Sequence, residues 1–373
     1  MSLNSNFSEN KERFEHICTL PFETFEVGSN GDVYCCCPNW NNFYSIGNIF
    51  SDNYEEIWNP ERVKELRKRI LNKDYSLCDK NSCPYCKRQL FPLSKRTLKK
   101  SFWKKDHPSF QIHMKKSPVS VKLGYDSECN IACKMCRDKI ICLSDEELQL
   151  FNSRIDSLLI PLLNDVQVLE VNVKGDPFAS RHSRLLAEKV AKKYKHIKFD
   201  FQTNGILCTE NMLKQLKISL DRIYAIRVSI HAATAETYSK IVQNGEKFFP
   251  VILENLKFLS LAREKHSFMF FLHFVVSAVN YKEIPDFIGM AEHFGARPFF
   301  WELRQVQYNY TALDNDFIVE PDHPLHEDLK KVLRNPLCMK YKDNFTPRLY
   351  SLMFDWRIFI CKLKIIRLLY WDY

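Results

Sequence analysis

The chain has 373 residues, of which 45% are hydrophobic and 27% charged, and its formal net charge is +9. This composition is that of a globular protein long enough to form more than one domain. No stretch of about 18 uncharged apolar residues occurs, and the polar N-terminus has no apolar signal-peptide region, so neither a membrane-spanning helix nor secretion is expected.

The chain has 14 cysteines. In a protein of the reducing cytoplasm, which is the location we expect, clustered cysteines indicate metal ligands more often than disulfides. Much of the positive charge lies in residues 93–116 and in the C-terminal tail, as is usual for a solvated linker or face, so nucleic-acid binding is not expected.

Composition divides the chain into four regions. Residues 1–92 hold half of the cysteines, residues 93–118 form a basic linker, residues 119–310 form a core, and residues 311–373 form an extension. The tail at 350–373 is both apolar and basic. It is typical either of a helix that packs on the sheet or a partner, or of a helix at a membrane surface.

In the core, strands alternate with helices. Apolar, β-branched runs predict strands at residues 119–123, 166–173, 197–203, 224–230, 268–276 and 297–303. Helical periodicity predicts helices at residues 144–163, 181–194, 209–219, 247–265 and 282–294. Ser144 and Glu147 form a capping-box pattern. The sequence therefore predicts an α/β fold, a partial (β/α)6 barrel whose chemistry lies at the carboxyl ends of parallel strands.

Three cysteines directly follow the first predicted core strand: Cys129, Cys133 and Cys136 in "CNIACKMC". The same spacing would place them on one face of a buried helix. Three thiolates suit zinc, with His113 or Cys142 as a fourth ligand, or a [4Fe–4S] cluster with one iron open to a non-protein ligand.

"CNIACKMC" resembles the CxxxCxxC signature of the radical S-adenosylmethionine (radical SAM) enzymes. The resemblance implies that the three cysteines hold a [4Fe–4S] cluster and that S-adenosylmethionine binds the open iron. Reductive cleavage would then give a 5′-deoxyadenosyl radical, which abstracts hydrogen from a substrate, with an electron donor such as flavodoxin or ferredoxin. Met135 would lie near the adenine.

Three further stretches resemble family elements, in the family's order. They are "VNVKGDPF", "FQTNG" and "VSIHAATAETYSKI". The resemblance implies S-adenosylmethionine contacts from Gly175, Asp176, Pro177, Asn204 and Ser229. Taken alone, Gly-Asp-Pro would be read as a plain turn.

The chain departs from the family pattern after Ser229. His231 and Ala232 replace Asp-Gly, and Val242 replaces an arginine that pairs with the S-adenosylmethionine carboxylate, a role for which Lys240 is a candidate. His231 is a candidate catalytic proton donor or, equally, part of the turn.

The N-terminal region resembles the SPASM domain, an auxiliary-cluster module, although that module usually follows the radical SAM core. The shared pattern includes "GDVYC", "IGNI", "IW" and "CPYC". The resemblance implies a second [4Fe–4S] cluster on Cys18, Cys36, Cys83 and Cys86, with Cys35, Cys37 and Cys78 as spares. A zinc ribbon is the alternative.

The sequence thus predicts a radical SAM enzyme that acts on a peptide, a protein side chain or a sugar. Two alternatives are a non-catalytic iron–sulfur or zinc scaffold and a radical SAM enzyme that modifies RNA, which the positive charge would favour.

Overall fold

The computed structural model describes residues 18–36, 45–79, 83, 111–303 and 317–354. Cys37, Cys86, linker residues 93–110 and tail residues 355–373 lie outside the described residues, as do Arg304 and Gln305 at the end of the core. Hydrogen-bonded strands follow the order β3-β2-β1-β4-β5-β6-β7-β8-β9 in a nine-stranded sheet. The chain divides into two compact units. One comprises residues 1–130, 141–202 and 210–225, and the other comprises residues 131–140, 203–209 and 226–373.

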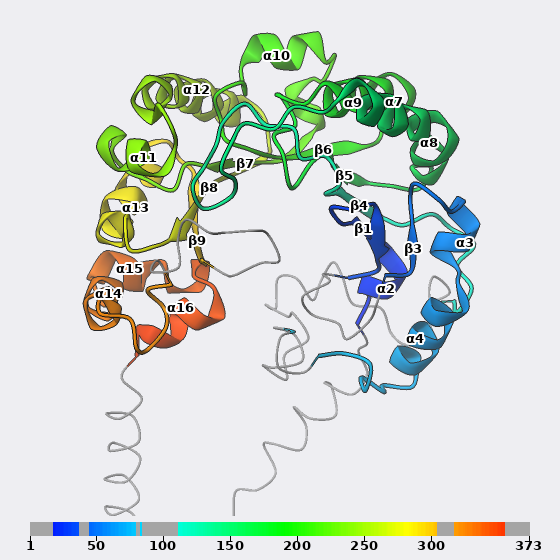
Figure 1. The fold of residues 1–373 in the computed structure, drawn as a ribbon, viewed down its shortest axis with the longest axis horizontal. Coiled ribbons are helices and arrows are strands. Elements are labelled where there is room, and N and C mark those ends of the chain that lie inside the picture. Colours follow the sequence, from blue (N-terminus) through cyan, green and yellow to red (C-terminus); the bar gives the residue numbers. More distant parts are fainter. Residues whose placement is uncertain (1–17, 37–44, 80–82, 84–110, 304–316, 355–373) are drawn as a thin grey trace, which may run out of the picture. The chain divides into compact units, whose positions relative to one another are not determined.

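The first unit is built on strands β4 (Ser120–Leu123), β5 (Val168–Glu170) and β6 (Lys198–Thr203). Neighbouring strands pair in parallel, with Val121 opposite Leu169 and Leu169 opposite Phe199. These three side chains are fully buried. Helices α7 (Asp145–Arg154), α8 (Ile160–Leu162) and α9 (Arg181–Lys193) lie along one side of these strands (Figure 1).

The N-terminal residues extend this parallel sheet. Strand β1 (Thr24–Val27) pairs in parallel with β4, and then in antiparallel fashion with β2 (Asp32–Tyr34), which pairs with β3 (Gly47–Asn48). A hairpin turn joins β1 to β2, and in it Gly31 adopts φ +83°, where a Cβ would collide with the Phe50 ring. The short helices of this region are α2 (Leu20–Glu23), α3 (Tyr54–Trp58) and α4 (Glu61–Leu71).

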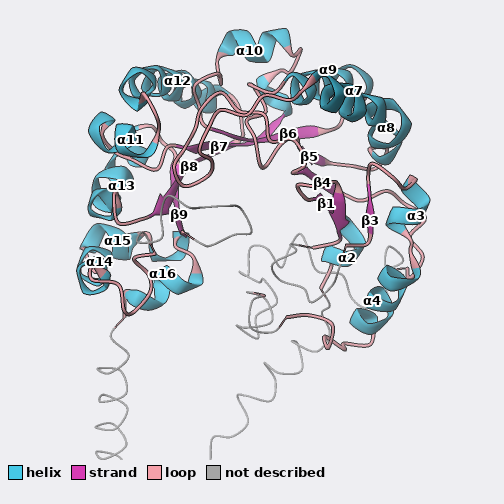
Figure 2. Cartoon of the chain, viewed as in Figure 1, coloured by secondary structure: helices cyan, strands magenta, loops and turns pink. Residues whose placement is uncertain are grey.

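In the second unit, strands β8 (Met269–Val276) and β9 (Arg297–Glu302) pair in parallel, and β7 (Ile223–Ser229) ends in this unit. Its helices are α11 (Ala235–Ile241), α12 (Gly245–Lys265), α13 (Ile284–His293), α14 (His326–Leu333), α15 (Pro336–Lys340) and α16 (Pro347–Leu352). Phe274, Phe287 and Phe300 pack together where α13 covers β8 and β9 (Figure 2).

The predicted α/β class is confirmed, with local differences. The predicted helix at 144–163 is interrupted by a π-helical turn (Ile155–Leu159) before Pro161, which has no amide hydrogen to continue the ladder. Strand β5 is shorter than predicted because the Asn172 side chain accepts hydrogen bonds from the amides of Lys174 and Gly175 and so forms a turn. Helix α10 spans only Glu210–Gln215.

Candidate functional site

The three-cysteine loop follows β4, as the sequence predicts. None of the three cysteines is in a disulfide; Cys129 is buried, Cys133 is partly exposed and Cys136 is exposed. Cys129 belongs to the first compact unit, and Cys133 and Cys136 belong to the second. Within the described residues, no three His, Cys, Asp or Glu side chains are grouped closely enough to hold a metal ion.

Each part of the loop is held by backbone hydrogen bonds. The Cys129 amide donates to the Ile141 carbonyl at 3.0 Å, which joins the two ends of the loop. The Cys133 carbonyl accepts from the amides of Cys136 and Arg137, both at 2.8 Å, so Cys133 and Cys136 share one tight turn. Met135, inside this turn, is buried. The turn is not part of a helix, so the helical-face interpretation of the three cysteines is wrong.

The third cysteine has a cationic neighbour. The Arg137 guanidinium donates from Nη2 to Sγ of Cys136 at 3.4 Å. This contact places a positive charge beside the sulfur of a predicted cluster ligand.

The Gly-Asp-Pro stretch packs directly on the residues before Cys129. A Cβ on Gly175 would lie 2.3 Å from the Glu128 carbonyl oxygen, so only glycine fits. The Asp176 amide donates to the same carbonyl at 2.9 Å. The carboxylate of Asp176 is buried, and its Oδ1 accepts from the amides of Phe178 and Ala179. Asp176 Oδ1 therefore shapes a turn, and its contact with S-adenosylmethionine stays a prediction, as does that of buried Pro177.

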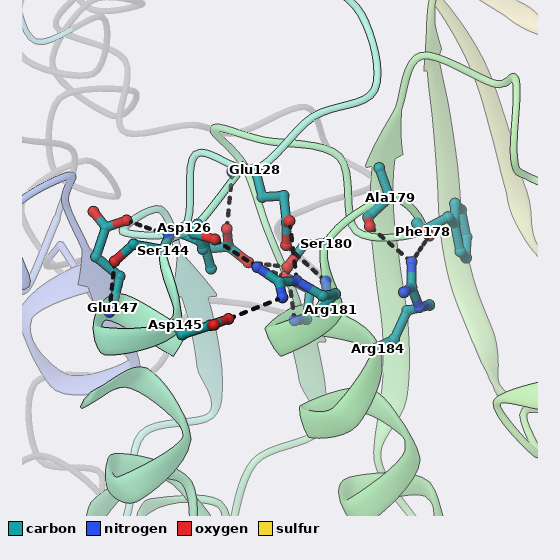
Figure 3. Close-up of polar contacts among 12 residues, drawn as sticks. Asp126, Glu128, Ser144, Asp145, Glu147, Phe178, Ala179, Ser180, Arg181 and Arg184 are labelled. Atoms are coloured by element: carbon teal, nitrogen blue, oxygen red, sulfur yellow. Dashed lines mark hydrogen bonds and ion pairs between the residues drawn. The ribbon is translucent and has the colours of Figure 1, made fainter. Parts of the chain in front are cut away.

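A second buried carboxylate reinforces this junction. Asp126 accepts hydrogen bonds from the hydroxyls of Ser180 and Ser183 and, at 3.0 Å, from the Glu128 amide (Figure 3). Ser180 is also the N-cap of α9, because its side chain accepts from the Ser183 amide. The residues before Cys129 are therefore bound to the N-terminus of α9.

Asn204 lies in the turn after β6. Its Oδ1 accepts from the Ile206 amide at 3.0 Å, and Asn255 Nδ2 donates to the carbonyls of Gly205 and Ile206. Gly205 has φ +86°, and a Cβ there would lie 2.6 Å from Val228. These contacts hold the turn in one conformation. The ligand roles of Asn204 and of Ser229, the last residue of β7, stay predictions.

His231 follows β7 with φ +61°, which is uncommon outside glycine and costly for a histidine backbone. Its Nδ1 accepts from the Val275 amide at 3.0 Å, and its carbonyl accepts from Asn280 Nδ2. Because a backbone amide only donates, Nδ1 is unprotonated and the neutral ring carries its hydrogen on Nε2. Burial lowers the pKa of His231 to about 4. His231 is therefore a neutral hydrogen-bond donor near pH 7.

The structure also describes Val242, which replaces the family's arginine, and Lys240, the candidate substitute. Val242 is buried, and the Cys133 backbone bridges to it. Lys240 Nζ lies 2.7 Å from Glu236 in an exposed ion pair one helical turn earlier. In this structure Lys240 thus has a partner on its own helix.

The N-terminal cysteines differ in burial. Cys35 and Cys83 are buried, whereas Cys18, Cys36 and Cys78 are partly exposed. Burial raises the pKa of Cys35 to about 12; nearby Arg67 opposes this shift, and Cys78 adds to it. Cys35 and Cys36 directly follow β2, in which Val33 is also buried.

Arg67 forms the centre of this N-terminal region. Its guanidinium is fully buried and donates to the carbonyls of Pro21 and Trp58 and to Oδ1 of Asn59. It also lies 4.6 Å from the centroid of the Trp58 ring. The "IW" signal and Arg67 therefore belong to one packed unit, in which each nitrogen of a buried cation donates a hydrogen bond.

Sequence reasoning missed three polar residues of the site: Asp126, Glu128 and Arg181. Their proximity to the first cysteine and to the start of α9 was a signal, but their partners are about fifty residues away in the chain. In the described part of the chain, no helix has the length and apolarity needed to cross a membrane.

Comparison with known families identifies the N-terminal region. Residues 18–87 match the SPASM family, described as an iron-sulfur cluster-binding domain. The prediction of a SPASM-like domain is thus confirmed, and the chain is an α/β protein whose N-terminal region matches this family. No curated protein sequence matches the chain.

Several similar solved structures are radical SAM proteins or carry S-adenosylmethionine. SuiB of Streptococcus suis bound to S-adenosylmethionine is 13% identical, with 76% of this chain and 60% of SuiB covered and a TM-score of 0.40. A radical SAM methyltransferase from Sphaerobacter thermophilus is 11% identical, with 61% and 64% covered and a TM-score of 0.37. TYW1 with a lysine-pyruvate adduct is 14% identical, with 59% and 72% covered and a TM-score of 0.34.

The chain thus spans less than two thirds of SuiB and of the methyltransferase. SuiB has also been solved with its precursor peptide SuiA.

Proposed function

We propose that the chain is a radical SAM enzyme with an N-terminal auxiliary iron-sulfur domain. The observation that carries the proposal is the loop after β4. It presents three cysteines that are in no disulfide, Cys129, Cys133 and Cys136, at the CxxxCxxC spacing. The SPASM match at residues 18–87 supports it independently, because it indicates a protein that binds iron-sulfur clusters.

The donor set fits a [4Fe–4S] cluster. Three cysteine ligands on a non-helical loop would leave one iron for S-adenosylmethionine, and Arg137 places a positive charge beside Cys136. When bound, the cluster and S-adenosylmethionine supply the radical that abstracts hydrogen. Cys18, Cys36, Cys83 and Cys86 would hold the auxiliary cluster, in keeping with the SPASM match.

The chain's own residues would bind and orient S-adenosylmethionine. Met135 is buried in the cysteine turn and would contact the adenine. The stretch from Gly175 to Pro177 packs on the residues before Cys129, so a ligand bound there would be placed next to the first cysteine. Asn204 and Ser229 would complete the S-adenosylmethionine contacts. His231 would donate a hydrogen bond from Nε2 and would not act as an acid, because its ring is neutral near pH 7.

The substrate we propose is a peptide, a protein side chain or a sugar. We also propose an electron donor such as flavodoxin or ferredoxin, because reductive cleavage needs a strong reductant, and a cytoplasmic location, where clustered cysteines stay reduced.

The test is Cys133→Ala, purified without oxygen and compared with the wild type and with Cys142→Ala. Cys142 is an exposed free cysteine near the end of the same loop and serves as the matched control. In Cys133→Ala we expect the loss of one cluster, about four irons, and the loss of 5′-deoxyadenosine formation. In Cys142→Ala we expect neither loss. Full iron content in Cys133→Ala would refute the proposal, and the loss of zinc in both variants would indicate a zinc site instead.

A further inference from the structure

Glu128, the residue before Cys129, has a buried carboxylate held by a single partner residue. Its Oε2 accepts from the Arg181 backbone amide at 2.8 Å, and its Oε1 lies 3.4 Å from Arg181 Nε. The glutamate is 7% exposed, so the ion pair is partly protected from solvent. Arg181 is also the first residue of α9, where a carboxylate is favoured by the helix dipole.

The same guanidinium binds the other end of the cysteine loop. Arg181 Nη2 donates to the carbonyl of Leu143 at 2.5 Å, and Nη1 lies 3.6 Å from Oδ1 of Asp145 (Figure 3). Leu143 directly follows Cys142, and Asp145 opens α7 behind the capping box of Ser144 and Glu147. One side chain thus contacts the residues on both sides of the loop.

We propose that Arg181 is a positioning residue for the three-cysteine loop and holds its two ends at a fixed separation. This inference rests on the proposed function of that loop as a cluster site. The guanidinium is suited to this role because its planar fork donates in several directions at once. A lysine ammonium at this position would reach Glu128 or Leu143, but its single nitrogen is a poor substitute for both contacts.

The junction has a second, independent attachment. Asp126 is bound by Ser180 and Ser183, and Asp176 by the Glu128 carbonyl, without any part of the Arg181 side chain. Removal of the guanidinium should therefore leave α9 and β4 folded. Among the hydrogen bonds of the described residues, only the backbone bond between Cys129 and Ile141 would then still connect the two ends of the loop.

Arg181→Ala and Arg181→Lys are compared with the wild type. The matched control is Lys189→Ala on the same helix, which removes an exposed ion pair with Asp156 that lies outside the loop. Hydrogen exchange of residues 128–143 is measured on cluster-free protein, and the rate of iron release to a chelator is measured on reconstituted protein. Circular dichroism confirms the fold of each variant.

In Arg181→Ala we expect the exchange rate of the Cys129 amide and the rate of iron release each to rise about tenfold. The expected effect is no larger because the guanidinium is half-exposed. Arg181→Lys should lie between Arg181→Ala and the wild type, and Lys189→Ala should match the wild type. If Arg181→Ala does not fold, the lysine variant carries the test.

Wild-type exchange rates in a folded Arg181 variant would overturn the positioning role. Faster exchange with unchanged iron release would overturn it too, because iron retention would then not depend on how the ends of the loop are held. A cluster site that keeps all its iron in Cys133→Ala is a different failure, since it refutes the proposed function and leaves the exchange result intact.

Discussion

The Tyr125 hydroxyl lies 2.6 Å from Nε2 of His182, and Nδ1 of the same ring lies 2.8 Å from Oδ1 of Asn152. Both residues are buried, and the rings of Phe50 and Phe151 surround the pair. A neutral imidazole satisfies both contacts when Nδ1–H donates to Asn152 and Nε2 accepts from Tyr125. Burial lowers the pKa of His182 to about 4 and raises that of Tyr125 well above its ordinary value.

This pair predicts a loss of stability in acid. Between about pH 6.5 and pH 4, unfolded His182 binds a proton that the folded state does not, so the free energy of unfolding falls as the pH falls. From pH 7 to pH 5 the loss from this residue should be about 2 kcal/mol. His182→Gln should reduce the pH dependence of urea unfolding by that amount. The same dependence in the variant and the wild type would contradict the buried neutral ring.

Gly175 predicts a steric effect. A Cβ at this position meets the Glu128 carbonyl at 2.3 Å and the Asp126 carbonyl at 3.0 Å, and backbone atoms yield little. Gly175→Ala should lower the free energy of unfolding by about 2 kcal/mol. It should also disturb the residues before Cys129, measured as faster hydrogen exchange there.

Gly289 provides the control for Gly175. It lies inside α13, and a Cβ there would have no neighbour within 4 Å. Gly289→Ala should raise the free energy of unfolding by about 0.5–1 kcal/mol, because alanine favours a helix over glycine. Equal effects of the two substitutions would show that Gly175 is not closely packed.

Arg137 predicts a shift in reduction potential. The hydrogen bond from its guanidinium to Cys136 Sγ places a positive charge beside the sulfur, where a reduced cluster would carry negative charge. Arg137→Gln should lower the potential by about 40 mV, the equivalent of about 1 kcal/mol for one electron. The measurement is a redox titration followed by electron paramagnetic resonance. Lys139→Gln, on the same loop, removes a charge without a described sulfur contact. A shift as large in this control would assign the effect to net charge alone.

Cys35 and Cys36 predict different losses. Cys36 is the ligand that the SPASM resemblance implies, whereas Cys35 is buried and, without a cluster, its pKa is raised to about 12. Cys36→Ala should therefore lose about four irons and retain stability, and Cys35→Ala should keep its iron and lose about 1 kcal/mol of stability from the core. The iron content and urea midpoint of each variant decide the assignment, and a reversed pattern would exchange their roles.

Much of the fold was predictable because its signals are local. Buried β-branched runs identified β4, β6, β7, β8 and β9 nearly to the residue, and the Ser144 and Glu147 capping box placed the start of α7. The cysteine spacing identified the loop after β4, and "GDVYC", "IW" and "CPYC" identified the SPASM region that the family match confirms. Chain-local periodicity and short motifs suffice for these features.

Other features depended on contacts between distant residues, which periodicity does not encode. The pairing of β1 with β4 joins residues that are about a hundred positions apart, and Arg67 is buried because the carbonyls of Pro21 and Trp58 converge on it. A charged residue in an amphipathic helix is normally read as exposed. Only the folded chain supplies enough acceptors to offset the cost of burying its charge.

The cysteine site shows the same division. The sequence by itself determined which thiols are present, how they are spaced and that they follow a strand. The tertiary structure decided that Glu128 and Leu143 share Arg181, that Gly175 packs on the Glu128 carbonyl, and that Nδ1 of His231 is occupied by the Val275 amide. The physical reason is that hydrogen bonding and close packing depend on positions in space, and the partners of this loop come from strands and helices far along the chain.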